Sequence, residues 1–171
     1  TLVGYMRDAS REPLTPVPEL PKLWQTWAGL IAKTFEINYK AAQMIHDSEE
    51  RLQQILNNSS AVVYVRDRDQ RFILVNQPFE RLLNVKQKDI IGKTLDEVFP
   101  AETAAEFRAN DARVINDNRT MEFEEYVTLE DGVHTYISNK FPLYDSNGDI
   151  NAICGISTDI TRRKHTEEAL R

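Results

Sequence analysis

Three runs near the end of the chain alternate hydrophobic and polar residues. They cover residues 120–129, 135–144 and 150–158, and the segments Glu130-Asp131-Gly132 and Asp145-Ser146-Asn147-Gly148 separate them. Alternation with a period of two is typical of strands that bury one face. Asp-Gly and Asn-Gly pairs favour hairpin turns. The pattern therefore predicts three antiparallel strands, joined by turns that include those two segments.

Upstream of these runs, two short stretches rich in β-branched and aromatic residues, 61–65 and 72–75, flank the polar segment Asp67-Arg68-Asp69-Gln70. This arrangement predicts a β-hairpin. Short helices are expected between this hairpin and the last three strands, from their periodicity and from breakers such as Gly92 and Pro100, over 78–83, 88–91, 94–99 and 102–116. The order of elements predicts an α+β fold with a five-stranded antiparallel sheet.

A different pattern covers residues 22–56, where apolar residues recur in steps of three and four, as on one face of a helix. We expect one long amphipathic helix, or two if Asp47 and Glu50 cap a new start. The apolar stripe on this helix either forms a parallel homodimer or packs on its own domain. Several small or polar residues on the stripe weaken it as a coiled-coil seam. The residues expected at the dimer interface are Trp24, Trp27, Ile31, Ile45 and Leu52.

The remaining segments complete the predicted organisation. Four prolines between residues 13 and 21 prevent a helix there, so residues 1–21 are expected to be an extended linker or the tail of an upstream domain. The folded domain is expected at 57–161, and residues 162–171 should begin a charged helix. Both ends of the chain are interpreted as cuts through a longer protein.

Composition narrows the functional classes. With 171 residues, 41% of them hydrophobic, the chain can bury one core. The net charge of -6, without a basic stripe, argues against a nucleic-acid partner. One cysteine excludes an internal disulfide and a cysteine-based zinc site. The absence of a long apolar run and of a secretory leader predicts no membrane span and a cytoplasmic location.

Catalytic and metal-binding motifs are missing. The sequence has no glycine-rich phosphate loop, no nucleophile motif and no recognisable catalytic pair of carboxylates, so we expect the chain itself not to be an enzyme. His46, His134 and His165 lack metal-ligand spacing and are interpreted as surface residues.

The last strand runs directly into the charged helix through Asp159-Ile160-Thr161. Asp159 and Thr161 are both good helix-capping residues, and Asp159 could also pair with Arg162 or Arg163. This segment is therefore expected to join the sheet mechanically to whatever follows.

Residues from about 48 to 171 resemble a PAS domain, a sensory module common in bacterial histidine kinases and cyclic-dinucleotide enzymes. The resemblance rests on the order of Val75-Asn76, Pro78-Phe79, Leu82-Leu83, Ile91-Gly92-Lys93, Phe99-Pro100, Asp131-Gly132, Phe141-Pro142-Leu143 and Asp159-Ile160-Thr161. It implies that the last of these motifs relays a signal to a downstream effector domain, and that the parent protein is a histidine kinase or a diguanylate cyclase. The segment before residue 57 more weakly resembles the end of a GAF-type sensor domain.

The resemblance also implies a pocket between the sheet and the short helices. Alternation counted from Asp131-Gly132 places one set of side chains in it: Met121, Phe123, Ile137, Asn139, Phe141, Ile153, Gly155 and Ser157. Asn139 and Ser157 are the polar members and would need a backbone partner, a water or a small-molecule ligand. Glu125 is expected at the open end, in water, and Cys154 on the outer side of the sheet. A filled core without ligand is the alternative.

The cofactor stays unknown at this level. Haem-binding relatives place a histidine on the long helix of the domain, and residues 57–132 contain none. Photoactive flavin relatives place a cysteine in a helical motif, whereas Cys154 lies in the last predicted strand. Haem binding of this kind and a covalent flavin adduct are therefore both disfavoured. Two functions remain open: a sensor and relay domain, and a structural dimerisation module with a filled core.

Overall fold

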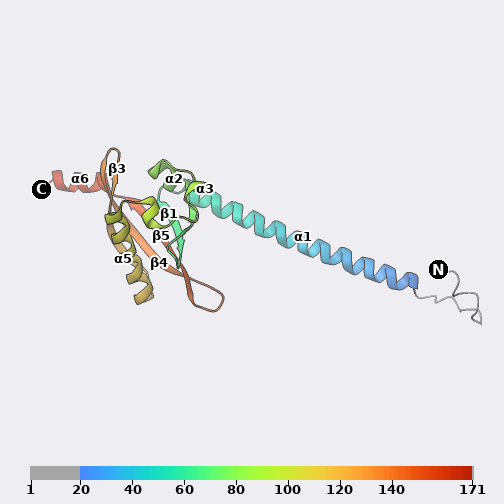
Figure 1. Ribbon diagram of the computed structural model, residues 1–171. Helices are drawn as coiled ribbons and strands as arrows, with labels where there is room; N and C mark the ends of the chain where they lie inside the picture. The colour runs from blue at the N-terminus through green and yellow to red at the C-terminus, as the bar shows by residue number, and fades with distance from the viewer. Residues whose placement is uncertain (1–19, 171) are drawn as a thin grey trace, which may run out of the picture. The chain divides into compact units, whose positions relative to one another are not determined.

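The computed structural model describes residues 20–170, and Figure 1 shows its elements. The chain divides between Ser48 and Glu49 into two units. Helix α1, Leu20–Asn58, crosses this division without interruption, so the predicted long helix is one helix rather than two. The predicted linker at residues 1–21 lies almost entirely outside the described residues.

The second unit contains the predicted five-stranded antiparallel sheet. Its strands lie in the order β2-β1-β5-β4-β3, so the first hairpin pairs with the last strand of the chain. The strands are β1 Val62–Asp67, β2 Phe72–Val75, β3 Met121–Leu129, β4 Gly132–Tyr144 and β5 Ile150–Asp159. Among them, β5 occupies the centre, between β1 and β4, and carries the most buried residues.

Four helices connect the two parts of the sheet, and a fifth follows it (Figure 1). The connecting helices are α2 Gln77–Leu83, α3 Gln87–Ile90, α4 Leu95–Val98 and α5 Ala101–Asp117. Helix α6, Thr161–Ala169, begins two residues after β5 ends. The α+β prediction and the number of helices are confirmed.

Asn76 fixes the start of α2 and the entry into the sheet. Its side-chain oxygen accepts from the backbone N–H groups of Phe79 and Val63, at 3.2 and 2.9 Å. Its amide nitrogen donates to the carbonyls of Leu56 and Ala61, both at 2.9 Å. All the hydrogen-bonding capacity of this buried amide is thus used to hold the end of α1, β1 and α2 together.

The core between sheet and helices is mainly aromatic and aliphatic. Phe72 and Phe79 meet edge to face with ring centroids 5.4 Å apart. Tyr64 lies over its cross-strand neighbour Gly155, where an added Cβ would come within 2.2 Å of the tyrosine ring. Glycine is therefore needed at position 155 to let the ring lie against the sheet.

Candidate functional site

A small cavity lies in the core between the sheet and helices α2 and α5. Its volume is about 30 Å³. The lining residues are mostly apolar or aromatic: Val62, Tyr64, Phe79, Leu82, Phe99, Phe107, Glu125, Val127, Tyr136, Ser138 and Ser157. Few polar groups in an apolar wall are typical of a small-molecule site.

Three of the polar groups around the cavity come from neighbouring strands. The hydroxyls of Ser138 on β4 and Ser157 on β5 are hydrogen-bonded to each other at 2.7 Å. Because that bond uses only one of their two protons, one hydroxyl can still donate. Glu125 on β3 is buried, and both of its interactions, with Asn110 at 2.9 Å and Lys140 at 2.6 Å, use Oε1. Its other carboxylate oxygen, Oε2, has no bonding partner among the described residues.

Glu125 belongs to a buried charge cluster, defined here as Arg66, Asp111, Glu125 and Lys140. Asp111 on α5 pairs with Arg66 at 2.6 Å and with Lys140 at 3.3 Å. Arg66 and Lys140 are 1% and 0% exposed. The two positive and two negative groups compensate one another, as buried charges require. The cluster attaches α5 to β1, β3 and β4.

Burial and the neighbouring charges act in opposite directions on these groups. Burial raises the pKa of the Asp111 carboxyl, and the positive charges of Arg66 and Lys140 partly offset that rise. Burial by itself lowers the pKa of Lys140, but the neighbouring groups, among them the two carboxylates of the cluster, outweigh it and raise the pKa. Lys140 is therefore held in its charged form.

Of the predicted pocket residues, those on β3 and β5 lie on the inner side of the sheet. Phe123, Ile153, Gly155 and Ser157 are buried, and Met121 is half-buried. Only Ser157 lines the cavity itself.

The face predicted for the β4 residues Ile137, Asn139 and Phe141 is wrong. Ser138 faces Ser157, so its neighbours point to the outer side, where Asn139 is exposed. The prediction used a three-residue turn at Glu130-Asp131-Gly132. The structure closes the hairpin with two residues, because Leu129 pairs with Gly132. One residue of difference in register moves every side chain of a strand to the other face.

The exit from the sheet, residues 159–161, is joined to Thr135 on β4 by hydrogen bonds. The Ile160 N–H donates to the Thr135 carbonyl at 2.8 Å, and the Thr135 N–H donates to Thr161 Oγ1 at 2.9 Å. Asp159 Oδ1 accepts from the Thr161 N–H at 2.8 Å. The first turn of α6 is thus bonded to the sheet rather than free.

Sequence reasoning placed His134 on the surface, but it is largely covered and bonded on both sides. The imidazole lies 2.9 Å from Asp159 Oδ2 and 3.0 Å from Asp131 Oδ1. It also stacks against the Tyr136 ring, with centroids 6.5 Å apart. These two carboxylates raise the pKa of His134. Burial by itself raises the pKa of Asp159, but its hydrogen bonds with Thr161 and His134 outweigh burial and lower that pKa.

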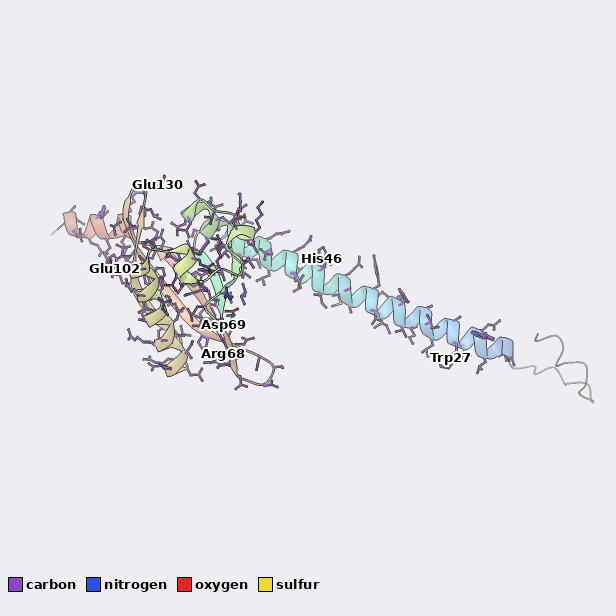
Figure 2. The ribbon with its side chains drawn as sticks, viewed as in Figure 1. Trp27, His46, Arg68, Asp69, Glu102 and Glu130 are labelled. Atoms are coloured by element: carbon purple, nitrogen blue, oxygen red, sulfur yellow. The ribbon has the colours of Figure 1, made fainter. Side chains whose placement is uncertain are left out.

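The predicted dimerisation residues lie on α1, and all five are more than half exposed: Trp24 71%, Trp27 54%, Ile31 58%, Ile45 61% and Leu52 52%. Figure 2 shows Trp27 projecting from the helix. Such large exposed apolar side chains along one helix leave an amphipathic stripe without a covering element in the described structure.

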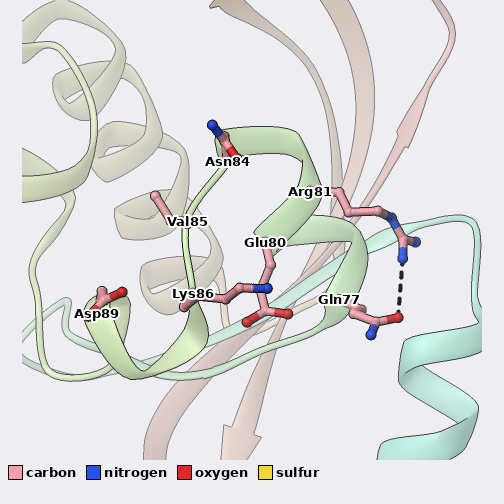
Figure 3. A pocket seen from close by; sticks show the side chains of 7 residues that line it. All are labelled: Gln77, Glu80, Arg81, Asn84, Val85, Lys86 and Asp89. Atoms are coloured by element: carbon pink, nitrogen blue, oxygen red, sulfur yellow. Dashed lines mark hydrogen bonds between the residues drawn. The ribbon is translucent and has the colours of Figure 1, made fainter.

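A larger hollow, of about 410 Å³, lies on the surface beside α2 and α3 (Figure 3). Three of its polar side chains already have partners: Arg81 donates to Gln77 at 3.1 Å, and Glu80 accepts from the Gln87 N–H at 2.7 Å. The described residues contain no cluster of His, Cys, Asp or Glu suited to a metal ion. In residues 20–170 no helix is both long and apolar enough to cross a membrane.

A profile described as the PAS fold matches residues 56–165, well over half of the chain. This chain belongs to the PAS fold family. The match covers the sheet, the cavity and the first turn of α6, so the cavity, the buried charge cluster and the exit from the sheet lie within the PAS domain.

Curated relatives of this PAS domain include a histidine kinase and a sensor protein. The chain is 30% identical over 154 residues to the methanogenesis regulatory histidine kinase FilI of Methanothrix harundinacea, covering 90% of this chain and 17% of the relative. It is 28% identical over 120 residues to the aerobic respiration control sensor protein ArcB of Escherichia coli, covering 70% of this chain and 15% of the relative. The chain therefore spans less than a fifth of either relative.

Solved structures show the same fold. The PAS domain of BvgS from Bordetella pertussis superimposes with a TM-score of 0.56 at 23% identity, covering 75% of this chain and 97% of that one. A VqmA–ligand–DNA complex from Vibrio cholerae superimposes with a TM-score of 0.58 at 28% identity, covering 64% of this chain and 51% of that one.

Proposed function

We propose that this PAS domain is a sensor and relay domain of a larger signalling protein of the histidine kinase type. In this proposal, a change at the core cavity or in α1 reaches an effector through Asp159, Ile160 and Thr161. The proposal is supported by the histidine kinase and the sensor protein among its relatives.

The observation that carries the proposal is that β4 and β5 contribute residues both to the cavity and to the exit from the sheet. Ser138 and Ser157 line the cavity on these strands. Thr135, three residues before Ser138, holds Ile160 and Thr161 through its backbone. A small shift between β4 and β5 at the cavity would therefore alter the hydrogen bonds that position α6.

The relay is tested by replacing Thr161 with Val in a protein that carries this domain ahead of a histidine kinase core. The change removes the acceptor for the Thr135 N–H at little cost in shape. Loss of a hydrogen bond of about 1 kcal/mol should shift a two-state output about fivefold, read as autophosphorylation. Thr166→Val is the matched control, because the Thr166 hydroxyl bonds only within α6. Equal effects of the two changes would contradict the relay.

For the ligand, we propose a small uncharged molecule that donates a hydrogen bond to Glu125 Oε2 and bonds the serine pair. Support comes from the unpaired carboxylate oxygen and the remaining hydroxyl donor in an aromatic wall. The cavity must widen around such a ligand, because a volume of 30 Å³ holds only about two waters.

Native mass spectrometry of the purified chain, compared with its denatured mass, tests the ligand. An extra mass lost on denaturation is expected in the unaltered chain and absent after Ser157→Val. Thr158→Val, on the exposed outer side of the same strand, is the control and should keep the extra mass. A bare mass in every sample favours the second candidate function, a structural module with a filled core, which the small cavity volume also supports.

We further propose that the partner of α1 is a second copy of this chain. The exposed stripe of Trp24, Trp27, Ile31, Ile45 and Leu52 has the three-and-four spacing of a parallel helical pair.

A further inference from the structure

His134 holds two carboxylates at once. Its Nδ1 lies 2.9 Å from Asp159 Oδ2, and its Nε2 lies 3.0 Å from Asp131 Oδ1. These two contacts are called here the His134 bridge. They join the β3–β4 turn, which carries Asp131, to the end of β5, which carries Asp159.

Only the protonated imidazole satisfies both contacts. A neutral imidazole has one N–H donor and one lone pair. With the proton on either nitrogen, the other would direct its lone pair at a carboxylate oxygen about 3 Å away. Imidazolium donates from both nitrogens and adds two charge-assisted bonds. Loss of the proton must therefore release one carboxylate.

The same Asp159 carboxylate positions the start of α6. Its Oδ2 bonds His134, while its Oδ1 accepts from the Thr161 N–H at 2.8 Å. Thr161 in turn accepts from the Thr135 N–H, on the residue next to His134. One carboxylate thus connects the charge of the imidazole to the first turn of the exit helix.

The other charges around the bridge are few. From α6, Arg162 and the imidazole of His165 line the same surface hollow as His134 and Asp159. Arg162 opposes protonation of His134, whereas Asp131 and Asp159 favour it. The Tyr136 hydroxyl, on the same strand as His134, stays neutral because burial and Asp159 raise its pKa. The two adjacent carboxylates outweigh the effect of burial, and the pKa of His134 is raised.

We infer that the His134 bridge makes the exit of this PAS domain proton-sensitive: it is closed when His134 is protonated and opens as the imidazole loses its proton. The inference rests on the proposed relay and names a regulation of the same joint. The direction follows from the raised pKa. A histidine stabilised in its charged form contributes fully below its ordinary pKa near 6.5, and the contribution is lost as pH rises through the raised value.

The test is an NMR titration of the chain from about pH 5 to about pH 9, which brackets the ordinary imidazole range. We expect the His134 side-chain nitrogens to titrate with a midpoint above 6.5. The backbone amide of Thr161 should shift with the same midpoint. The chain has three histidines, so each can be assigned by its own substitution.

Matched variants separate the bridge from general effects of pH. His134→Gln should abolish the titration of the Thr161 amide, since glutamine keeps a donor but has no titrating charge. His165→Gln, in the same surface hollow, should leave that titration in place. A His134 midpoint at or below 6.5, or a Thr161 amide that titrates unchanged in His134→Gln, would overturn the inference.

The relay and the proton sensitivity can fail separately. In one outcome, the Thr161 amide titrates with His134, but Thr161→Val does not change autophosphorylation of the kinase fusion. This result would support the proton-sensitive bridge and contradict the relay. In the opposite outcome, Thr161→Val changes autophosphorylation, but the Thr161 amide does not titrate with His134. This result would support the relay and contradict the proton-sensitive bridge.

Discussion

At the scale of single residues, the buried charge cluster is the feature that distinguishes this core from an ordinary apolar one. Asp111 is 0% exposed and is the only acidic group of the cluster that contacts both cations. Removing its charge leaves Arg66 without an acidic partner in the cluster. Its removal should therefore cost far more than the loss of a surface pair.

We expect Asp111→Asn to destabilise the domain by about 3–5 kcal/mol, because one partner of a buried ion pair is removed while the other stays charged. The free energy of unfolding in urea at neutral pH measures this. Arg108→Met is the matched control on the same helix: its pair with Asp96 is equally short, at 2.6 Å, but about half exposed. That change should cost less than about 1 kcal/mol. Similar losses in the two variants would contradict this account.

Sequence reasoning identified Ser157 but missed Arg66, Lys140 and Asp111, for a physical reason. Charged side chains are rarely buried, so pattern reading assigns them to the surface. The signal that could have found Lys140 was the turn: with a two-residue loop, the even positions of β4 point inward, and Lys140 is one of them. Asp111 on the predicted helix 102–116 gave no such signal.

At the scale of elements, the sequence was most informative where the periodicity was long. The continuous stripe of α1 and the alternation of the last three strands predicted their positions within a few residues. Turn geometry was the weak point, because loops of two and three residues share the same turn-forming residues. That single ambiguity misplaced Ile137, Asn139 and Phe141.

For α1, we expect Trp27→Lys combined with Ile31→Lys to weaken self-association at least about tenfold, since each buried large side chain contributes about 1.5–3 kcal/mol. Sedimentation equilibrium over a range of concentrations measures the change. Lys33→Gln, an exposed position off the predicted seam, should leave association unchanged. If the unaltered chain is monomeric at all concentrations, the proposed homodimer is wrong.

At the scale of the whole molecule, the order of elements along the chain was enough to predict the fold. A hairpin, four short helices and three strands allow few arrangements other than one antiparallel sheet with helices on a face. The pairing of β1 with β5, between residues about 90 positions apart, completes the sheet and was implied only by the family resemblance. Which ligand or partner acts on the domain depends on single side chains, and the fold leaves that open.

The two sets of charges described above differ in their access to dissolved ions. The Debye length falls from about 8 Å at physiological ionic strength to about 3 Å at 1 M salt, and screening acts mainly on exposed groups. Arg66 and Asp111 are shielded from the solution, whereas Asp131 and Asp159 are 74% and 41% exposed. We expect 1 M sodium chloride to accelerate hydrogen exchange of the Thr161 amide, with little effect on the Val63 amide in β1. Ionic strength would then act as a solvent variable that loosens the exit of the domain while the core keeps its structure.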